Sequence, residues 1–113
     1  MKHFKVFYSL YRTDREVSAD HPVEMSEADI YSEMLGGLEH DGDFFGLKDD
    51  EETTLQVMYN GDDDSYWIEI PRPDRGGSFG CALSFDEITD VFKSLPARFS
   101  ETMIPRMAFE SWG

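Results

Sequence analysis

Residues 44–92 decide the fold, and they read FFGLKDDEETTLQVMYNGDDDSYWIEIPRPDRGGSFGCALSFDEITDVF. In several runs of this stretch apolar residues alternate with polar ones, which places one set of side chains on each face of a β-strand. Asn60 and Gly61, between two such runs, have the chemistry of a hairpin turn. The stretch therefore predicts an antiparallel meander with strands at Phe44–Lys48, Thr53–Tyr59, Ser65–Pro71 and Ser78–Leu83.

Two helices are expected, each with a serine as its N-cap. Ser84 is followed three residues later by Glu87, which is the spacing of a capping box, and the apolar residues that follow share one helical stripe. Ser26 precedes a second amphipathic pattern. That pattern contains Gly36 and Gly37, where either the helix ends early or another element packs closely. The predicted helices are Ser26–Glu39 and Ser84–Leu95.

The two ends of the chain complete the predicted fold. Lys2–Arg12 alternates like a strand, and the polar segment Thr13–Glu24 is expected to be a surface loop. Ala97–Gly113 contains apolar residues without a regular period; we expect a packed arm or a short helix after Pro105, the alternative being an exposed patch rich in Met and aromatic residues. The predicted class is α+β, with an antiparallel four- to five-stranded sheet and two helices on one face, in one domain of residues 1–113.

The chain is strongly acidic, with 24 acidic residues against 10 basic ones and a formal net charge of −14. This charge argues against binding nucleic acid or an anionic membrane surface and favours a basic protein partner. Lys2 and Lys5 interrupt the N-terminal apolar residues, so no signal peptide or membrane span is expected. Cys81 is the one cysteine, which excludes an internal disulfide, and we expect it to be buried. These features predict a cytoplasmic protein.

Ten of the 24 acidic residues lie between Glu39 and Asp64. In a regular meander the acidic connection at residues 49–52 lies at the opposite end of the sheet from the one at residues 62–64. The connection before the first meander strand lies at the same end as residues 62–64. We therefore predict one acidic rim, formed by Asp41, Asp43, Asp62, Asp63 and Asp64.

Three hypotheses account for this rim. The first is a solvated edge without a partner, and the second is a divalent-cation site. The third is a docking surface on which carboxylates attract a basic protein. The spacing does not match an EF-hand loop, and no zinc or phosphate-loop pattern is present, so we predict no metal and no cofactor. Catalysis has little support, because the carboxylates are exposed by pattern and Glu69 reads as an outward-facing strand residue on the side of Trp67.

Residues 44–95 resemble the small immunity proteins of bacterial polymorphic toxin and contact-dependent competition systems. The resemblance rests on three motifs: the Leu55-Gln56-Val57 strand, the strand Tyr66–Ile70 with its acidic residue, and the Ser-x-x-Glu helix start at Ser84. It implies a small protein without a cofactor that neutralises a toxin by tight, charge-steered occlusion of its active site. It carries over no functional residue, because such families bind toxins through variable surfaces.

We therefore predict a protein that is not an enzyme and that inhibits a cognate toxin by direct binding. The alternatives are an acidic mimic of nucleic acid, or a regulatory binding protein of that kind, and a metal-assisted hydrolase that uses the same aspartates. Trp67 and Trp112 are candidate aromatic anchors, since tryptophan is enriched where binding energy concentrates. The predicted partner-binding residues are Asp41, Asp43, Asp62, Asp63, Asp64, Trp67 and Trp112.

Overall fold

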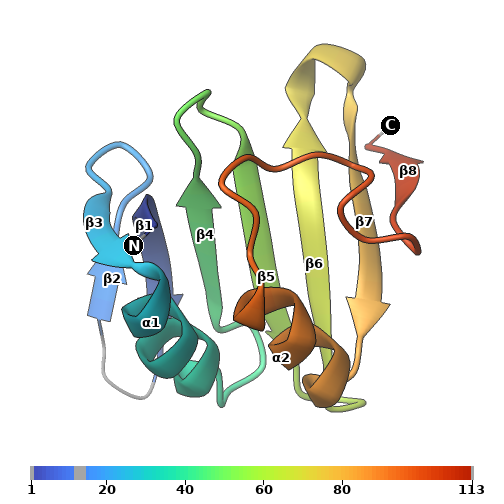
Figure 1. The fold of residues 1–113 in the computed structure, drawn as a ribbon. Coiled ribbons are helices and arrows are strands. Elements are labelled where there is room, and N and C mark those ends of the chain that lie inside the picture. The colour runs from blue at the N-terminus through green and yellow to red at the C-terminus, as the bar shows by residue number, and fades with distance from the viewer. Residues whose placement is uncertain (1, 12–14, 113) are drawn as a thin grey trace.

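One antiparallel sheet of eight strands forms the framework in the computed structural model, which describes residues 2–11 and 15–112. The strand order is β2-β1-β4-β5-β6-β7-β8, and β3 pairs with the same side of β1 as β2 does (Figure 1). The strands are β1 His3–Leu10, β2 Arg15–Val17, β3 Val23–Ser26, β4 Phe44–Lys48, β5 Thr54–Asn60, β6 Ser65–Arg72, β7 Gly77–Leu83 and β8 Ala108–Ser111.

Both longer helical segments lie on one face of this sheet (Figure 1). The first is capped by Ser26, whose hydroxyl accepts the N–H of Asp29 at 3.2 Å. It ends at Gly37, two residues before the predicted end, where a Cβ atom would lie 3.3 Å from Cδ1 of Leu10. Its consecutive parts are α1 Glu27–Asp29, the π-helical η1 Ile30–Met34 and the 3₁₀-helical η2 Leu35–Gly37.

The second helix, α2, runs from Phe85 to Lys93 and has the predicted capping box. The Ser84 hydroxyl accepts the N–H of Glu87 at 3.2 Å, and the Ser84 N–H donates to the Glu87 carboxylate at 2.9 Å. A short 3₁₀ turn, η3 (Pro73–Arg75), connects β6 to β7. The local capping signal in the sequence therefore placed the beginning of α2 correctly.

The predicted α+β class with a four- to five-stranded sheet is wrong, because the structure is mostly sheet, with 43% of the described residues in strands and 21% in helices. Three short edge strands account for the difference. β2 and the first half of β3 lie in the segment predicted to be a loop, and β8 lies in the predicted C-terminal arm. Edge strands form by pairing their backbone with a free sheet edge, so they need no apolar alternation of their own. Residues 12–14 of the predicted strand and loop, and residue 113 of the arm, lie outside the described residues.

The hydrophobic core lies between the sheet and the helical layer. Ring contacts join the two layers: Phe45 of β4 meets Phe92 of α2 at a centroid distance of 5.5 Å, and Phe4 of β1 stacks on Phe99 at 5.3 Å. Burial of this apolar surface is the main stabilising term. The fully buried apolar side chains include Val6, Ile30, Phe45, Leu47, Leu55, Val57, Ile68, Ile70, Ile88 and Leu95.

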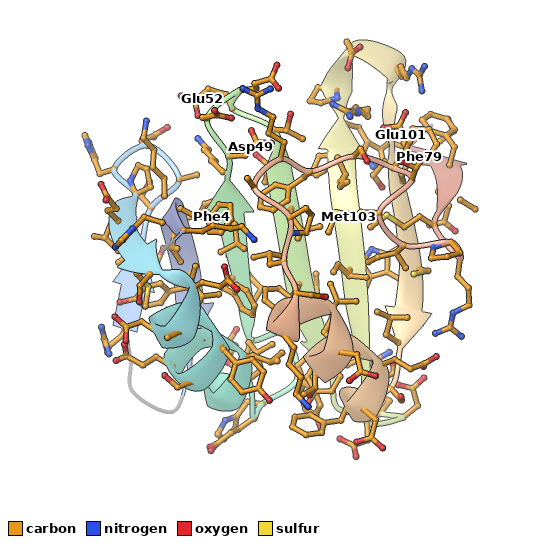
Figure 2. All side chains as sticks on the ribbon, in the orientation of Figure 1. Phe4, Asp49, Glu52, Phe79, Glu101 and Met103 are labelled. Carbon is orange, nitrogen blue, oxygen red and sulfur yellow. The ribbon has the colours of Figure 1, made fainter. Side chains whose placement is uncertain are left out.

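The segment between α2 and β8 crosses the helical side of the sheet before it returns to the edge (Figure 1). Asp49, at the β4–β5 connection, holds this segment, because its carboxylate accepts the N–H of Phe99 at 2.9 Å (Figure 2). The same carboxylate accepts the N–H groups of Glu51 and Thr53, both at 2.9 Å. The arm is therefore packed as far as Ile104, which is buried, whereas β8 is exposed.

In the part of the chain that the structure describes, no helix is long and apolar enough to cross a membrane.

Candidate functional site

Four of the five predicted rim residues lie together at one end of the sheet. The Asp41 carboxylate accepts the N–H of Gly61 in the β5–β6 turn at 3.0 Å, and the turn itself carries Asp62, Asp63 and Asp64, all exposed. The connection at residues 49–52 lies at the other end, between β4 and β5. The placement of the two acidic connections at opposite ends of the sheet is therefore confirmed.

Asp43 does not belong to this rim, because its side chain is fully buried. Its carboxylate accepts the backbone N–H groups of Tyr11 at 2.9 Å, Glu39 at 3.0 Å and His40 at 2.9 Å. Burial by itself raises the pKa of the Asp43 carboxyl, but these hydrogen bonds outweigh burial and hold the pKa below its ordinary value. Asp43 joins β1 to the loop before β4 and is not available to a partner.

Aromatic side chains accompany the exposed carboxylates at this end. Tyr59 contacts Tyr66 at a centroid distance of 5.2 Å, and Tyr66 contacts Phe85 at 6.0 Å. The Tyr59 hydroxyl donates to Asp64 at 2.5 Å, and this bond raises the pKa of Tyr59 to about 12. Phe85 is 54% exposed at the beginning of α2. We call Asp41, Asp62, Asp63, Asp64, Tyr59 and Phe85 the acidic end.

The sheet face opposite the helices is the second candidate surface. A row of larger side chains crosses three neighbouring strands there, because Phe44 of β4 pairs with Met58 of β5 and Met58 pairs with Trp67 of β6. In an antiparallel sheet such cross-strand neighbours lie within contact distance on one face. The face turned to solvent therefore carries apolar side chains where polar ones are the norm.

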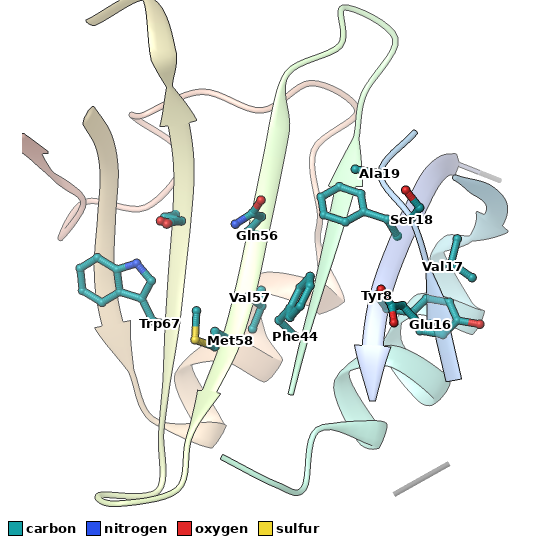
Figure 3. Close-up of a pocket in the computed structure, with 12 residues that line it drawn as sticks. Tyr8, Glu16, Val17, Ser18, Ala19, Phe44, Gln56, Val57, Met58 and Trp67 are labelled. Atoms are coloured by element: carbon teal, nitrogen blue, oxygen red, sulfur yellow. The ribbon is translucent and has the colours of Figure 1, made fainter. Parts of the chain in front are cut away.

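Two glycines allow aromatic rings to lie flat on this face. A Cβ atom on Gly46 would overlap the ring of Phe7, which is only 6% exposed. A Cβ atom on Gly80 would lie 2.7 Å from Cζ2 of Trp67, and Figure 3 shows the Trp67 indole turned toward β7. The absence of a side chain at each glycine thus fixes where each ring lies.

A hollow of about 390 Å³ lies over the centre of this face (Figure 3). Gln56 and Glu69 form a cross-strand pair in its floor, and Glu16 lies at its β2 side. Sequence reasoning placed Glu69 beside Trp67 but did not identify the hollow, since its walls come from strands far apart in the sequence. The lining residues are Phe7, Tyr8, Glu16, Val17, Ser18, Ala19, Phe44, Gln56, Val57, Met58, Trp67 and Glu69.

A second hollow, of about 570 Å³, lies on the same face toward the β8 edge. Trp67 and Glu69 line both hollows, so the two adjoin. The structure thereby brings the two predicted anchors together, because Trp67 and the 57% exposed Trp112 line this second hollow. We call it the tryptophan cleft; it is lined by Trp67, Glu69, Ser78, Glu110, Ser111 and Trp112.

Acidic and basic side chains occupy different parts of this face. Among the described residues that line the two hollows none is basic. Lys5 and Lys48 are cross-strand neighbours nearer the end of the face that carries the β4–β5 connection. The Nζ atom of Lys5 lies 3.8 Å from Glu52, and that of Lys48 donates to the Ala19 carbonyl at 3.3 Å. The hollows and the adjacent acidic end therefore form a negative surface with aromatic side chains.

The remaining candidates for chemistry are metal-ligating side chains and the thiol of Cys81. Within residues 2–11 and 15–112, no group of three or more His, Cys, Asp or Glu side chains is placed to hold a metal ion. Cys81 is buried on the helical side of the sheet, as expected, and burial raises the pKa of its thiol. No protein-family model, curated protein or solved structure matches this chain.

Proposed function

We propose that this protein is a non-enzymatic inhibitor that binds a basic protein, namely a cognate toxin domain, and occludes its active site. The observation that carries the proposal is the uncovered sheet face, where Phe44, Met58 and Trp67 form an aromatic and apolar row beside carboxylates. Exposed apolar patches bordered by polar groups are typical of protein-binding surfaces. The likeness of residues 44–95 to immunity proteins, which act in this way, supports the same proposal.

The negative charge of the protein indicates that the proposed partner is positively charged. The net charge of −14 creates a negative field around the protein, and Asp62 and Asp63 extend it beyond the end of the open face. Carboxylates at the margin of an interface speed the encounter with a basic partner and select against acidic ones. The apolar row then supplies the contact area that slows dissociation. Trp67 lies two residues from the start of β6, so the two surfaces adjoin.

The proposed site of action is the cytoplasm, with a toxin that acts there. The proposal involves no cofactor, no nucleic acid and no membrane. A toxin whose substrate is nucleic acid carries a basic active-site surface, because it must neutralise phosphates, and such a surface is complementary to the acidic end.

Capture from a nuclease-treated lysate of the native host tests this function. The tagged protein is immobilised, washed at low and at high salt, and the retained proteins are identified by mass spectrometry. We expect one basic partner that stays bound at high salt. Recovery of several DNA-binding proteins that are lost at high salt would instead indicate a nucleic-acid mimic, and recovery of nothing would overturn the proposal.

The association rate of the captured partner tests the role of the acidic end. In the double variant Asp62→Lys/Asp63→Lys, we expect the rate to fall by about tenfold at low salt, while dissociation changes little. The matched control is Glu33→Lys/Asp90→Lys, which alters net charge equally at two exposed positions on the helical face. An equal decrease in both variants would show that only net charge matters, and no decrease in either would remove the acidic end from the interface.

A further inference from the structure

The tryptophan cleft has a more specific composition than the rest of the open face. Its lining residues come from β6, β7, β8 and the position after β8, and they are two tryptophans, two glutamates and two serines. The strand register explains why these residues lie near one another. Ser78 of β7 pairs with Glu110 of β8, and Gly80 of β7 pairs with Glu69 of β6 on the opposite side of β7. Residues that are far apart in sequence, such as Glu69 and Glu110, thus line one cleft.

The indole of Trp67 is held in place before any ligand arrives. Its ring lies over Gly80, where a Cβ atom would lie 2.7 Å from Cζ2, and Ala82 is its cross-strand neighbour. Side chains that are fixed in advance lose little conformational entropy on binding. Trp112 follows β8 directly. Its backbone N–H donates to the Gly76 carbonyl at 2.9 Å, and this bond fixes the backbone beside the second indole.

The cleft contains two carboxylates, those of Glu69 and Glu110. Within residues 2–11 and 15–112, no hydrogen bond or ion pair involves the side chain of Glu69 or Glu110. Both line the same cleft as the two tryptophans, and Glu69 is partly buried there. An arrangement of indole faces with unpaired carboxylates is complementary to a flat cation.

We propose that the tryptophan cleft binds the guanidinium group of an arginine side chain on the partner protein; this deepens the proposed function and rests on it. A guanidinium stacks on an indole face and at the same time donates two parallel hydrogen bonds to a carboxylate. An ammonium group is a more strongly hydrated point charge and cannot form this fork. Arginine is accordingly the residue whose side chain best suits a cleft lined by tryptophans and glutamates.

Intrinsic fluorescence provides a direct test, because Trp67 and Trp112 are the two tryptophans of the sequence and both line the cleft. The folded protein is titrated with the peptide acetyl-Gly-Arg-Gly-amide. The controls are the same peptide with citrulline, which has nearly the same shape without the charge, and with lysine. We expect a saturable change in emission with arginine, a weaker one with lysine and none with citrulline. Equal responses to arginine and citrulline, or no response, would overturn the inference.

Variants connect the signal to the carboxylates. In Glu69→Gln/Glu110→Gln we expect the arginine peptide to bind at least about fivefold more weakly, since charge-assisted hydrogen bonds are lost. The matched control, Glu33→Gln/Asp90→Asn, removes two charges from the helical face and should leave binding unchanged. Far-UV circular dichroism of each variant checks that it is folded. Unchanged binding in the Glu69/Glu110 variant would contradict the assignment of the cleft.

The failure of this inference and the failure of the proposed function are distinguishable. If a basic partner is captured but the peptide does not bind, the cleft assignment is wrong and the binding function stands. If the peptide binds but no partner is captured, the cleft is a guanidinium site and the inhibitor function is wrong. If the captured partner binds the Glu69→Gln/Glu110→Gln variant as tightly as the original protein, the cleft lies outside their interface.

Discussion

The carboxylate of Asp43 is buried beside three backbone N–H donors. It accepts three backbone N–H groups, from Tyr11 in the segment after β1 and from Glu39 and His40 in the loop that precedes β4. In a buried site these donors would otherwise lack partners, which is costly. Asp43 was predicted to bind a partner. In the structure its carboxylate instead links the segment after the helices to the end of β1.

Replacing Asp43 with Asn should destabilise the protein. The amide keeps one oxygen but turns an NH₂ group toward backbone donors, so at least one N–H loses its acceptor. We expect a loss of about 2–3 kcal/mol in the free energy of unfolding, measured by urea denaturation. The control is Asp41→Asn, which removes the charge of an exposed rim carboxylate that accepts one N–H. Equal losses in the two variants would contradict this account.

The same replacement should change the pH dependence of stability. The pKa of Asp43 is lower in the folded protein than in the unfolded chain, so its contribution is present above the unfolded value, near 3.8, and is lost as pH falls below it. The free energy of unfolding measured from pH 6 down to pH 3 should therefore fall less steeply in Asp43→Asn than in the original protein.

At the scale of the elements, the pairing of β1 with β4 depends on one aromatic ring and one glycine. Phe7 pairs with Gly46 across the two strands, and the ring covers the space that a side chain at position 46 would occupy. Aromatic cover of a strand glycine compensates for the packing that glycine itself lacks. The Phe7 ring is thereby part of the lining of the central hollow.

Gly46→Ala should therefore destabilise the protein by about 1–3 kcal/mol, because the Phe7 ring must move from its place on the sheet. The free energy of unfolding is measured alone and in a Phe7→Ala background, where the cost should largely disappear. Gly36→Ala is the control: nothing lies within 4 Å of a Cβ at that position, and alanine favours helical backbone. A cost that persists without Phe7 would show that the ring is not its cause.

The whole molecule carries its charge unevenly. Acidic side chains occupy both ends of the sheet, while the core between sheet and helices is apolar. At low ionic strength the surplus of 14 negative charges repels itself in the compact state, and salt screens that repulsion. Stability should thus depend on salt in a predictable direction.

We expect the melting temperature to rise by a few degrees when NaCl is increased from about 20 to about 200 mM, as the Debye length falls below the spacing of the surface carboxylates. Differential scanning calorimetry measures this change. In Asp62→Lys/Asp63→Lys, which carries less surplus charge, the rise should be smaller. A melting temperature that falls with salt would mean that ion pairs such as Arg98 with Asp50 outweigh the repulsion.

Much of the central architecture followed from local sequence. Period-two alternation predicted β5 to β7, the Ser84–Glu87 spacing predicted the beginning of α2, and the hairpin chemistry of Asn60-Gly61 placed the acidic turn at one end of the sheet. These signals act over a few residues, so a single sequence reveals them. The acidic charge and the single cysteine are likewise properties of the sequence alone.

Only the tertiary structure decided the edge strands and the candidate site. β2, β3 and β8 exist because a neighbouring strand offers unpaired backbone groups, which no pattern within these short segments indicates. Asp43 is buried because the loop closes over it, and Trp67 and Trp112 line one cleft because β8 pairs with the edge of β7. Burial and proximity are set by contacts between residues far apart in the chain, and local periodicity does not encode such contacts.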